Sequence, residues 1–397
     1  MTDVQVRGKK IALLDSSDNI IYTLPDSAGT AGDAMVTDGA GKLFFGGINL
    51  NAVLTAGDSS NLNANILGNV RLGDTVVNSL DFARPGGFAS HGYAVAGSSG
   101  PAASTNLSTA DKYPFATDTM VSEAINVLGS PRRHVASNAS STHGYTSGGT
   151  HESNPDPLSS SIEKFGFALP NTISEVGDLS QVRVVMSDAT QSLTHGYQVG
   201  GQIPPRPTTT TSNVIDKFPF SSDTNASDVG DLTQARETTT SPGSATHGYC
   251  AGGRASNIGT NSGVNIIEKY PFASDANAAD VGDLAISRVH AASSQNSDTN
   301  GYVSGGRSGP PGSTLADIQK FPFASDTDAT DIGNATIARY HVAGSSSQNK
   351  GYIHGGGRFP PFAAHDDISS FPFATDTAIN HPAALTINRF VVGGTQG

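Results

Sequence analysis

The stretch His247-Gly248-Tyr249-Cys250-Ala251-Gly252-Gly253 decides the fold, because the chain carries six variants of it. Its leading tripeptide recurs in five further copies: His91-Gly92-Tyr93, His143-Gly144-Tyr145, His195-Gly196-Tyr197, Asn300-Gly301-Tyr302 and Lys350-Gly351-Tyr352. The central glycines lie 52, 52, 52, 53 and 50 residues apart along the chain. A period near 50 residues is typical of β-propeller blades rather than of solenoid turns. The sequence therefore predicts an all-β protein with a six-bladed β-propeller.

Each repeat predicts four short strands. Five of the six copies carry a Gly-Gly pair three residues after the tyrosine, and such glycines favour a crowded strand near the propeller axis. A later strand carries two aromatic residues separated by one residue: Tyr113-Pro114-Phe115, Phe165-Gly166-Phe167, Phe218-Pro219-Phe220, Tyr270-Pro271-Phe272, Phe321-Pro322-Phe323 and Phe371-Pro372-Phe373. Because side chains alternate along a strand, both aromatics face one side, and we expect them to pack between blades.

The order of Gly-Gly pair, aromatic pair, leucine and arginine resembles the kelch repeat over residues 86–397. Kelch repeats carry a tryptophan before the leucine, whereas this chain contains none and has Val-Gly-Asp near that place. The resemblance implies propeller architecture and says little about activity, because one fold hosts many functions. Arg389 lies fifty residues after Arg339 and so continues the repeat. We therefore expect residues 390–394 to supply a strand to the first blade, beside Tyr93, and to close the ring.

Residues 1–85 precede the repeats and predict a small β domain of their own. Residues 4–14 and 19–24 favour two strands, and Asp38-Gly39 is a hairpin-turn signal. Residues 22–43, which include Leu24-Pro25 and Thr37-Asp38-Gly39-Ala40-Gly41, resemble a segment common in tail-fibre and other virion proteins of tailed phages. The Asp-Val-Gly-Asp-Leu repeats are similar to those in structural proteins of marine cyanobacterial phages. These resemblances imply a virion protein that attaches and oligomerises through residues 1–85, taken here as a homotrimer.

Composition excludes several classes of function. The net charge of −12 argues against a nucleic-acid partner, because no basic stripe offsets the repulsion of phosphates. No run approaches the 18 apolar residues that a membrane span requires, so we expect no membrane insertion. The first ten residues lack the apolar core of a signal peptide. We therefore expect synthesis in the host cytoplasm and a final location in the virion.

Two sets of arginines are candidate ligand-binding residues. The kelch resemblance places the first set, which follows glycine pairs, at one end of the central channel: Arg254, Arg307 and Arg358. The second set follows the last strand of its repeats and is expected to point to the same end: Arg236, Arg288 and Arg339. Guanidinium groups bind carboxylates and phosphates through paired hydrogen bonds, which indicates an anion or glycan site. The alternative is structural pairing with the aspartates of the repeats.

The loops that follow the glycine pairs differ most between copies. They fall within residues 151–155, 204–208, 308–311 and 358–362. All should emerge on one face, and variable loops on a rigid scaffold are where binding surfaces are usually built. The alternative is neutral drift of exposed loops.

Metal and catalytic chemistry find little support in the sequence. A ring of histidines could form a metal belt, but we interpret it as hairpin turns in which His-Gly replaces Asn-Gly: His91, His143, His195 and His247. Three acidic runs could seat calcium or form Asx turns, and both interpretations stay open: residues 223–225, 275–277 and 326–328. We expect no catalytic residues, no metal site, no cofactor and no enzymatic activity.

Two functions remain after these exclusions. The first is a structural protein of a phage virion, such as a tail fibre or other appendage. Its N-terminal domain would contact other virion proteins, and its propeller would contact a host-surface glycan, a receptor or another virion protein. The second is a kelch-type protein-interaction module of a cytoplasmic complex. The fibre-like segment within residues 22–43 favours the first.

Overall fold

The computed structural model describes most residues of the propeller and, before them, the backbone of seven strands. The described residues of the propeller are 89–100, 105–117, 123–151, 158–168, 171–184, 189–204, 210–255, 263–309, 312–358 and 363–397. The chain divides into two compact units, residues 1–67 and residues 68–397. The domain boundary predicted near residue 85 lies outside the described residues.

The strands before the propeller are short and pair locally. They are β1 (Val4–Arg7), β2 (Lys10–Leu14), β3 (Ile20–Thr23), β4 (Ala34–Thr37), β5 (Leu43–Gly46), β6 (Asn69–Leu72) and β7 (Thr75–Asn78). Residues 4–14 were expected to form one strand, but they form the antiparallel pair β1–β2, with Arg7 opposite Lys10. Strands β4 and β5 pair on either side of Asp38-Gly39, as the hairpin signal predicts.

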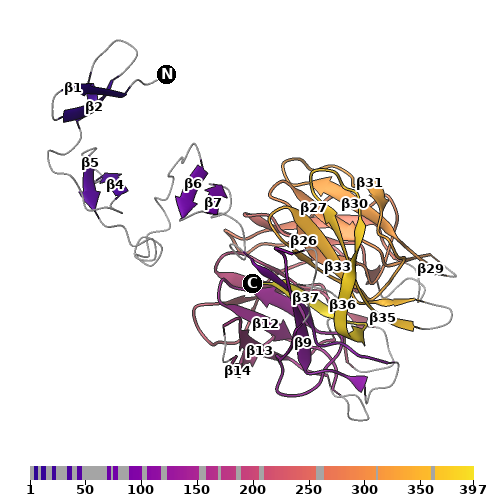
Figure 1. Cartoon of the computed structure of the whole chain (residues 1–397). Coiled ribbons are helices and arrows are strands. Elements are labelled where there is room, and N and C mark those ends of the chain that lie inside the picture. The colour runs from indigo at the N-terminus through magenta and orange to yellow at the C-terminus, as the bar shows by residue number, and fades with distance from the viewer. Residues whose placement is uncertain are drawn as a thin grey trace. The chain divides into compact units, whose positions relative to one another are not determined.

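Each regular element in the described residues is a β-strand (Figure 1), and the strands from residue 91 onward form six antiparallel blades about a central axis. The strands of each blade, from the axis outward, are as follows. Blade 1 has β37 (Gly393–Gln396), β8 (His91–Val95), β9 (Thr109–Pro114) and β10 (Glu123–Asn126); blade 2 has β11 (Ala136–Ala139), β12 (His143–Ser147), β13 (Ser161–Gly166) and β14 (Ile173–Asp178); blade 3 has β15 (Thr190–Gln191), β16 (His195–Val199), β19 (Val214–Pro219) and β20 (Ser227–Asp231).

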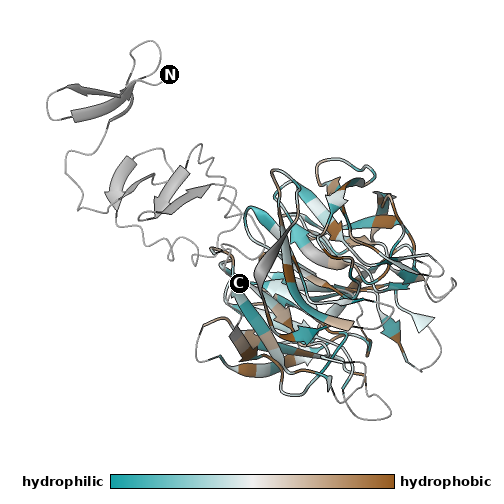
Figure 2. Ribbon diagram, turned by 45° about the vertical axis from the view of Figure 1, so that its right-hand side comes forward, coloured by the Kyte–Doolittle hydropathy of each residue, from teal (hydrophilic) through white to brown (hydrophobic). Residues whose placement is uncertain are grey.

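Blades 4 to 6 repeat this order. Blade 4 has β22 (His247–Ala251), β24 (Ile266–Pro271) and β25 (Ala279–Asp283) outside an innermost segment, residues 240–243, that is joined by single bridges; blade 5 has β26 (Ala292–Asn296), β27 (Asn300–Ser304), β30 (Asp317–Pro322) and β31 (Thr330–Asn334); blade 6 has β32 (Ala343–Ser346), β33 (Lys350–His354), β35 (Ala363–Pro372) and β36 (Ile379–Arg389). Short ribbons add β17 (Gln202–Ile203), β18 (Thr210–Thr211), β21 (Arg236–Glu237), β23 (Arg254–Ala255), β28 (Arg307–Ser308), β29 (Ser313–Thr314) and β34 (Gly357–Arg358). Polar and apolar residues are mixed throughout the blades (Figure 2).

The Gly-Tyr strand is the second strand from the axis, not the innermost one. In blade 2 the sheet order is β11-β12-β13-β14, and β11 lies at the axis. Gly144 makes room for a side chain of the next strand, because a Cβ at this position would overlap the ring of Phe165. The glycine is needed because the aromatic ring lies flat across the strand, and the other five tripeptide glycines face an aromatic ring in the same way.

The aromatic strand packs between blades, as predicted. The second aromatic residue of each pair stacks on the tyrosine of the preceding blade, with ring centroids 4.6 to 5.0 Å apart: Tyr93–Phe167, Tyr145–Phe220, Tyr197–Phe272, Tyr249–Phe323, Tyr302–Phe373 and Tyr352–Phe115. Aromatic pairs contribute about 0.5–1.5 kcal/mol beyond the burial of their area. Six stacks of one geometry therefore hold the blades in a ring without any tryptophan.

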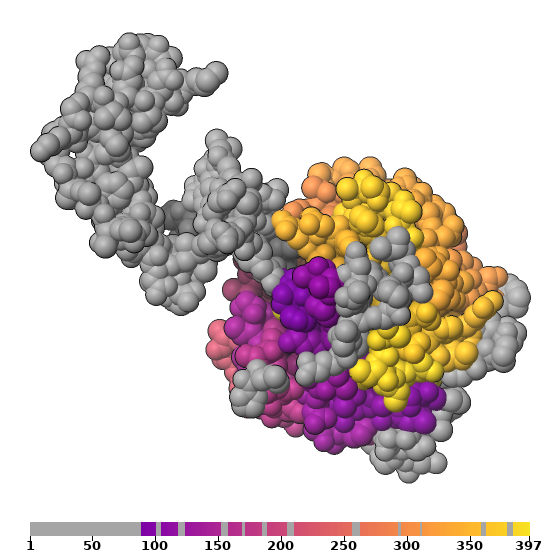
Figure 3. Space-filling view, in the orientation of Figure 1, coloured from indigo at the N-terminus to yellow at the C-terminus, as the bar shows by residue number. Residues whose placement is uncertain are grey.

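The C-terminal strand closes the ring, as predicted from the phase of Arg389. Strand β37 pairs with β8 of blade 1, with Thr395 opposite Tyr93 and Gly393 opposite Val95. The paired strand begins three residues later than the expected segment 390–394, and Phe390 contributes a single bridge to Ser98. In the space-filling view the yellow C-terminal residues meet the indigo and purple residues of blade 1 (Figure 3).

Candidate functional site at the channel mouth

One end of the central channel is built from short antiparallel bridges that every blade repeats. The residue after each glycine pair bridges to a residue just before the same blade's innermost strand. The six pairs are Ser98–Phe390, Thr150–Arg133, Gln202–Val184, Arg254–Glu237, Arg307–Val289 and Gly357–Tyr340. We call these pairs, together with the described residue that follows the second member in five of them, the mouth. The identical geometry with different side chains makes the mouth a position where one scaffold presents varied chemistry.

Backbone hydrogen bonds link the five described residues that follow these pairs in a row around the axis. His134, Thr238, His290, His341 and Val391 have φ angles between 53° and 58°, in the left-handed region. The backbone N–H of His341 donates to the carbonyl of His290 at 2.9 Å, and that of Val391 donates to the carbonyl of His341 at 3.2 Å. A non-glycine residue in this region costs about 1–3 kcal/mol, so the surrounding hydrogen bonds must hold each one in place.

Basic and aromatic side chains gather at the mouth on blades 4 to 6. The guanidinium of Arg307 lies 5.0 Å from the ring centroid of Tyr340, a cation–π contact. The imidazoles of His290 and His341 are 3.7 Å apart between ring centroids, and His341 lies 4.9 Å from Tyr340. Arg254 forms an ion pair with the buried carboxylate of Glu237. The mouth thus combines two guanidinium groups with two imidazoles in tilted contact and a phenol.

Burial decides the charge of the two imidazoles. Desolvation lowers the pKa of His290, and the neighbouring His341 lowers it further. Desolvation, with the charge of Arg307 nearby, lowers the pKa of His341 to about 3. Both rings are therefore neutral near pH 7, although each keeps part of its surface open. The positive charge of this cluster comes from Arg254 and Arg307, which donate N–H groups to an anion without a change of protonation.

The structure separates the two predicted sets of arginines. Arg254 and Arg307 lie at the mouth, and Arg358 is exposed on β34. Arg236, Arg288 and Arg339 are 0 to 1% exposed and cannot contact a ligand at the surface. The prediction that these three residues form a ligand site is therefore wrong, and the structural alternative holds for them.

The buried arginines belong to a set of six, one for each blade, that connect the segment before the innermost strand to the other strands of the same blade. Sequence reasoning missed two other members, Arg132 and Arg183, and used the sixth, Arg389, only for its phase in the repeat. In every blade the guanidinium donates a hydrogen bond to the backbone carbonyl of the residue three positions after the tyrosine. These acceptors are Gly148, Gly200, Gly252, Gly305, Gly355 and Ala96. In five blades the guanidinium also meets a carboxylate of the aromatic strand: Glu163, Asp216, Glu268, Asp317 and Asp111. The sequence carried a signal for this ion pair in four of these blades, namely an acidic residue two positions before the first aromatic residue of the pair.

The other predicted polar positions are also structural. His143 begins β12 and hydrogen bonds through Nδ1 to the Thr142 hydroxyl at 2.8 Å, while Ser140 Oγ accepts from the backbone N–H of His143. The expected His-Gly turn is wrong in detail, because the turn precedes the histidine and the glycine lies within the strand. The hairpin interpretation itself holds, and the equivalent contacts recur at His91, His195 and His247.

The acidic runs tie each blade to the one before it. Asp223 accepts a hydrogen bond from Nζ of Lys164 at 2.7 Å, and Asn225 Oδ1 accepts from the backbone N–H of Asp178 at 3.1 Å. The runs that begin at Asp275 and Asp326 make the same contacts to blades 3 and 4. Across the described ranges, no group of three or more His, Cys, Asp or Glu residues is suited to a metal ion.

Two further expectations concern the variable loops and a membrane span. The variable loops, expected to form a binding face, lie largely outside the described residues, at 152–157, 205–209, 310–311 and 359–362. In the part of the chain that the structure describes, no helix is long and apolar enough to cross a membrane.

Comparison with known proteins supports the fold alone. The solved structure of a protein called YjhT superposes with a TM-score of 0.58 and 11% sequence identity, covering 75% of this chain and 97% of that chain. No protein-family profile matches the chain, and no curated protein matches it. The six-bladed all-β propeller is thus confirmed, while the kelch and phage resemblances stay predictions.

Proposed function

We propose that this chain is a recognition component of a phage virion, such as a tail fibre or other appendage. Residues 1–85 attach it to other virion proteins, and the propeller mouth binds an anionic glycan of the host surface or an acidic surface of another virion protein. The observation that carries the proposal is the basic cluster of Arg254 and Arg307 beside Tyr340 at the mouth. A local concentration of guanidinium groups on a chain of net charge −12 favours a specific anionic partner.

The mouth offers both parts of a glycan-binding surface. Guanidinium groups recognise carboxylates through two parallel hydrogen bonds, and an aromatic ring provides an apolar face for a sugar. Glu237 already holds Arg254, so a ligand carboxylate would meet Arg307 and the exposed Arg358 more directly. The blades need no partner to cover open strands, because β37 closes the ring. A closed propeller of low charge is suited to exposure on the outside of a particle.

The first test removes the cations at the mouth and beside it. The double variant Arg307→Ala, Arg358→Ala should reduce adsorption of particles to host cells about tenfold, the effect expected when one charge-assisted contact is lost. Arg254 is best replaced together with Glu237 (Arg254→Ala, Glu237→Gln), since Arg254→Ala alone would leave a buried carboxylate without its partner. Lys350→Ala, at the hairpin end of β33, is the matched control. Unchanged adsorption in both mouth variants, with an unchanged melting temperature, would refute the recognition role.

The second test concerns attachment. A variant that begins near Pro85 should fold, because the blades and their closure lie after that residue, but it should fail to enter particles. Normal incorporation would contradict the anchoring role of residues 1–85. Incorporation into a cytoplasmic complex instead would favour the interaction-module alternative.

A further inference from the structure

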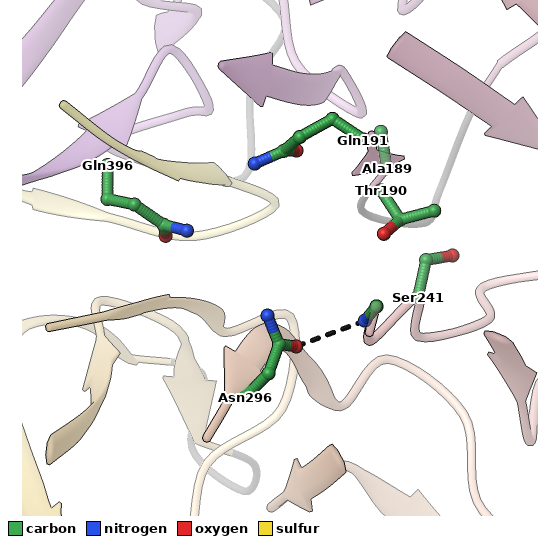
Figure 4. Close-up of a pocket in the computed structure, with 7 residues that line it drawn as sticks. Ala189, Thr190, Gln191, Ser241, Asn296 and Gln396 are labelled. Carbon is green, nitrogen blue, oxygen red and sulfur yellow. Dashed lines mark hydrogen bonds between the residues drawn. The ribbon is translucent and has the colours of Figure 1, made fainter. Parts of the chain in front are cut away.

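A small cavity lies on the channel axis at the end where the innermost strands turn into their hairpins (Figure 4). Its main polar groups are the amides of Gln191, Asn296 and Gln396, which come from β15, β26 and β37 in three different blades. Thr190 adds a hydroxyl group. The space of about 10 Å³ is enough for one small occupant. The site is separate from the mouth, where the proposed recognition takes place.

Hydrogen bonds fix which end of two amides faces the cavity. Asn296 Oδ1 accepts from the backbone N–H of Gly243 at 3.1 Å. Gln396 Oε1 accepts from the backbone N–H of Ser346 at 3.1 Å. A backbone N–H needs an oxygen as its partner, so each amide must turn its NH₂ group the other way. Figure 4 shows the nitrogens of both side chains, together with that of Gln191, turned toward one shared space.

One largely buried polar side chain at the cavity has no hydrogen-bond partner among the described residues. Gln191 is 9% exposed, and its side chain makes no hydrogen bond with any described residue. The Ser241 hydroxyl also has no partner among the described residues, but it is turned away from the three amides (Figure 4). A buried polar group left unsatisfied costs about 1–3 kcal/mol, so such groups usually indicate a bound partner.

We propose that this cavity binds one halide-sized anion, with chloride as the physiological occupant. The amide NH₂ groups of Gln191, Asn296 and Gln396 donate to it from three blades. None of the lining residues is acidic, so no carboxylate repels an anion or invites a cation. The three donors converge from separate blades, so the anion links blades 1, 3 and 5 across the axis. This inference does not rest on the proposed recognition role of the mouth.

The first experiment locates the ion with bromide, which scatters anomalously. Crystals of the full chain grown in chloride are soaked in sodium bromide, and the anomalous map is inspected on the axis. The expected result is a peak in contact with the side chains of Gln191, Asn296 and Gln396. A map with bromide only on the outer surface, or with the axial density refining as water and no anomalous signal, overturns the proposal.

The second experiment measures the contribution of the ion to stability. The melting temperature of the full chain should rise by about 1–3 °C when sodium gluconate is replaced by sodium chloride or bromide at equal ionic strength. Gln191→Leu should abolish this halide-dependent shift. It should still fold, because the amide of Gln191 bonds to no other described residue. Gln181→Leu, at an exposed glutamine, is the matched control and should retain the shift.

Every outcome decides the question. A shift that is equal in the wild type, Gln191→Leu and Gln181→Leu is a general salt effect and overturns the proposal, as does the absence of any shift. If Gln191→Leu does not fold, the bromide map of the wild-type protein decides alone. Gln191→Glu gives an independent check: a carboxylate in the cavity should eliminate the bromide peak by repulsion.

Discussion

The pair formed by Arg183 and Asp216 allows a quantitative test of how much a buried ion pair contributes to the stability of a blade. Both side chains are 0% exposed and form an ion pair. Asp216 also accepts from the backbone N–H of Ser180 at 3.1 Å. Asp216→Ala leaves the guanidinium of Arg183 buried without a counter-charge, which costs about 3–5 kcal/mol. The remaining bonds of Arg183 to the carbonyls of Gly200 and Val214 do not compensate for the lost charge.

The expected shift in melting temperature follows from the size of the unit. An unfolding entropy of about 2.1 cal/mol/K per residue, applied to residues 68–397, gives about 0.7 kcal/mol/K. A loss of about 4 kcal/mol therefore lowers the melting temperature by about 6 °C. Thermal and urea unfolding followed by circular dichroism would measure both quantities. Asp223→Ala removes an exposed ion pair and should cost less than about 1 kcal/mol, which makes it the control.

A double variant separates charge imbalance from general damage. Replacing both partners with apolar residues (Arg183→Met, Asp216→Leu) removes the buried charge together with its partner, so it should cost clearly less than Asp216→Ala alone. The reasoning is refuted if Asp216→Ala costs no more than Asp223→Ala, or if the double variant is the least stable of the set.

Three further predictions concern the strands, the closure and the mouth. Gly144→Ala should destabilise the protein by about 3 kcal/mol or more in urea unfolding, because the added Cβ overlaps an aromatic ring. Gly166→Ala is the control: Gly166 pairs with His143 on the same two strands and has room for a Cβ, so the change should cost less than about 1 kcal/mol. Equal effects of the two substitutions would contradict the packing argument. Removal of residues 393–397 should expose the edge of blade 1 and lower the melting temperature by about 10 °C or more in calorimetry, and a change of only a few degrees would show that β37 is dispensable. Between pH 6.5 and pH 4 the free energy of unfolding of the wild type should fall more steeply than that of His341→Gln, by at most about 1.4 kcal/mol per pH unit. The pKa of His341 is lowered to about 3 in the folded chain, so in this range the unfolded chain binds a proton that the folded chain does not; the stability contribution is complete above about pH 6.5 and is lost as the pH falls. Parallel pH profiles of the two proteins would exclude this contribution.

The architecture was predictable because it rests on local, repeated chemistry. The Gly-Tyr tripeptide gave the number of blades, the alternation of Phe218 and Phe220 gave their packing, and the phase of Arg389 gave the closure. The order of strands within a blade was not predictable in the same way. Gly144 is explained by a ring on the adjacent strand, and that contact depends on register between segments some twenty residues apart.

The site was only partly predictable, for a physical reason. Arg254 and Arg307 were placed correctly because they directly follow glycine pairs. The histidine pair was missed, since His290 and His341 lie about fifty residues apart and meet only when two blades adjoin at the axis. Their left-handed backbone also has no glycine or asparagine to mark it in the sequence. The donor cavity escaped notice because three neutral amides from separate blades carry no motif.

Comparison of the six repeats with one another explains why one arginine set was misassigned. The arginine before the innermost strand occurs in all six copies, including Arg132, Arg183 and Arg389, because each copy solves the same packing problem. The position after the glycine pair holds six mouth residues that differ more widely: Ser98, Thr150, Gln202, Arg254, Arg307 and Gly357. Every blade needs the same internal bonds, so invariance of the arginine among the copies marks the scaffold. The position after the glycine pair is free of that packing constraint, which is why we place the proposed recognition surface there.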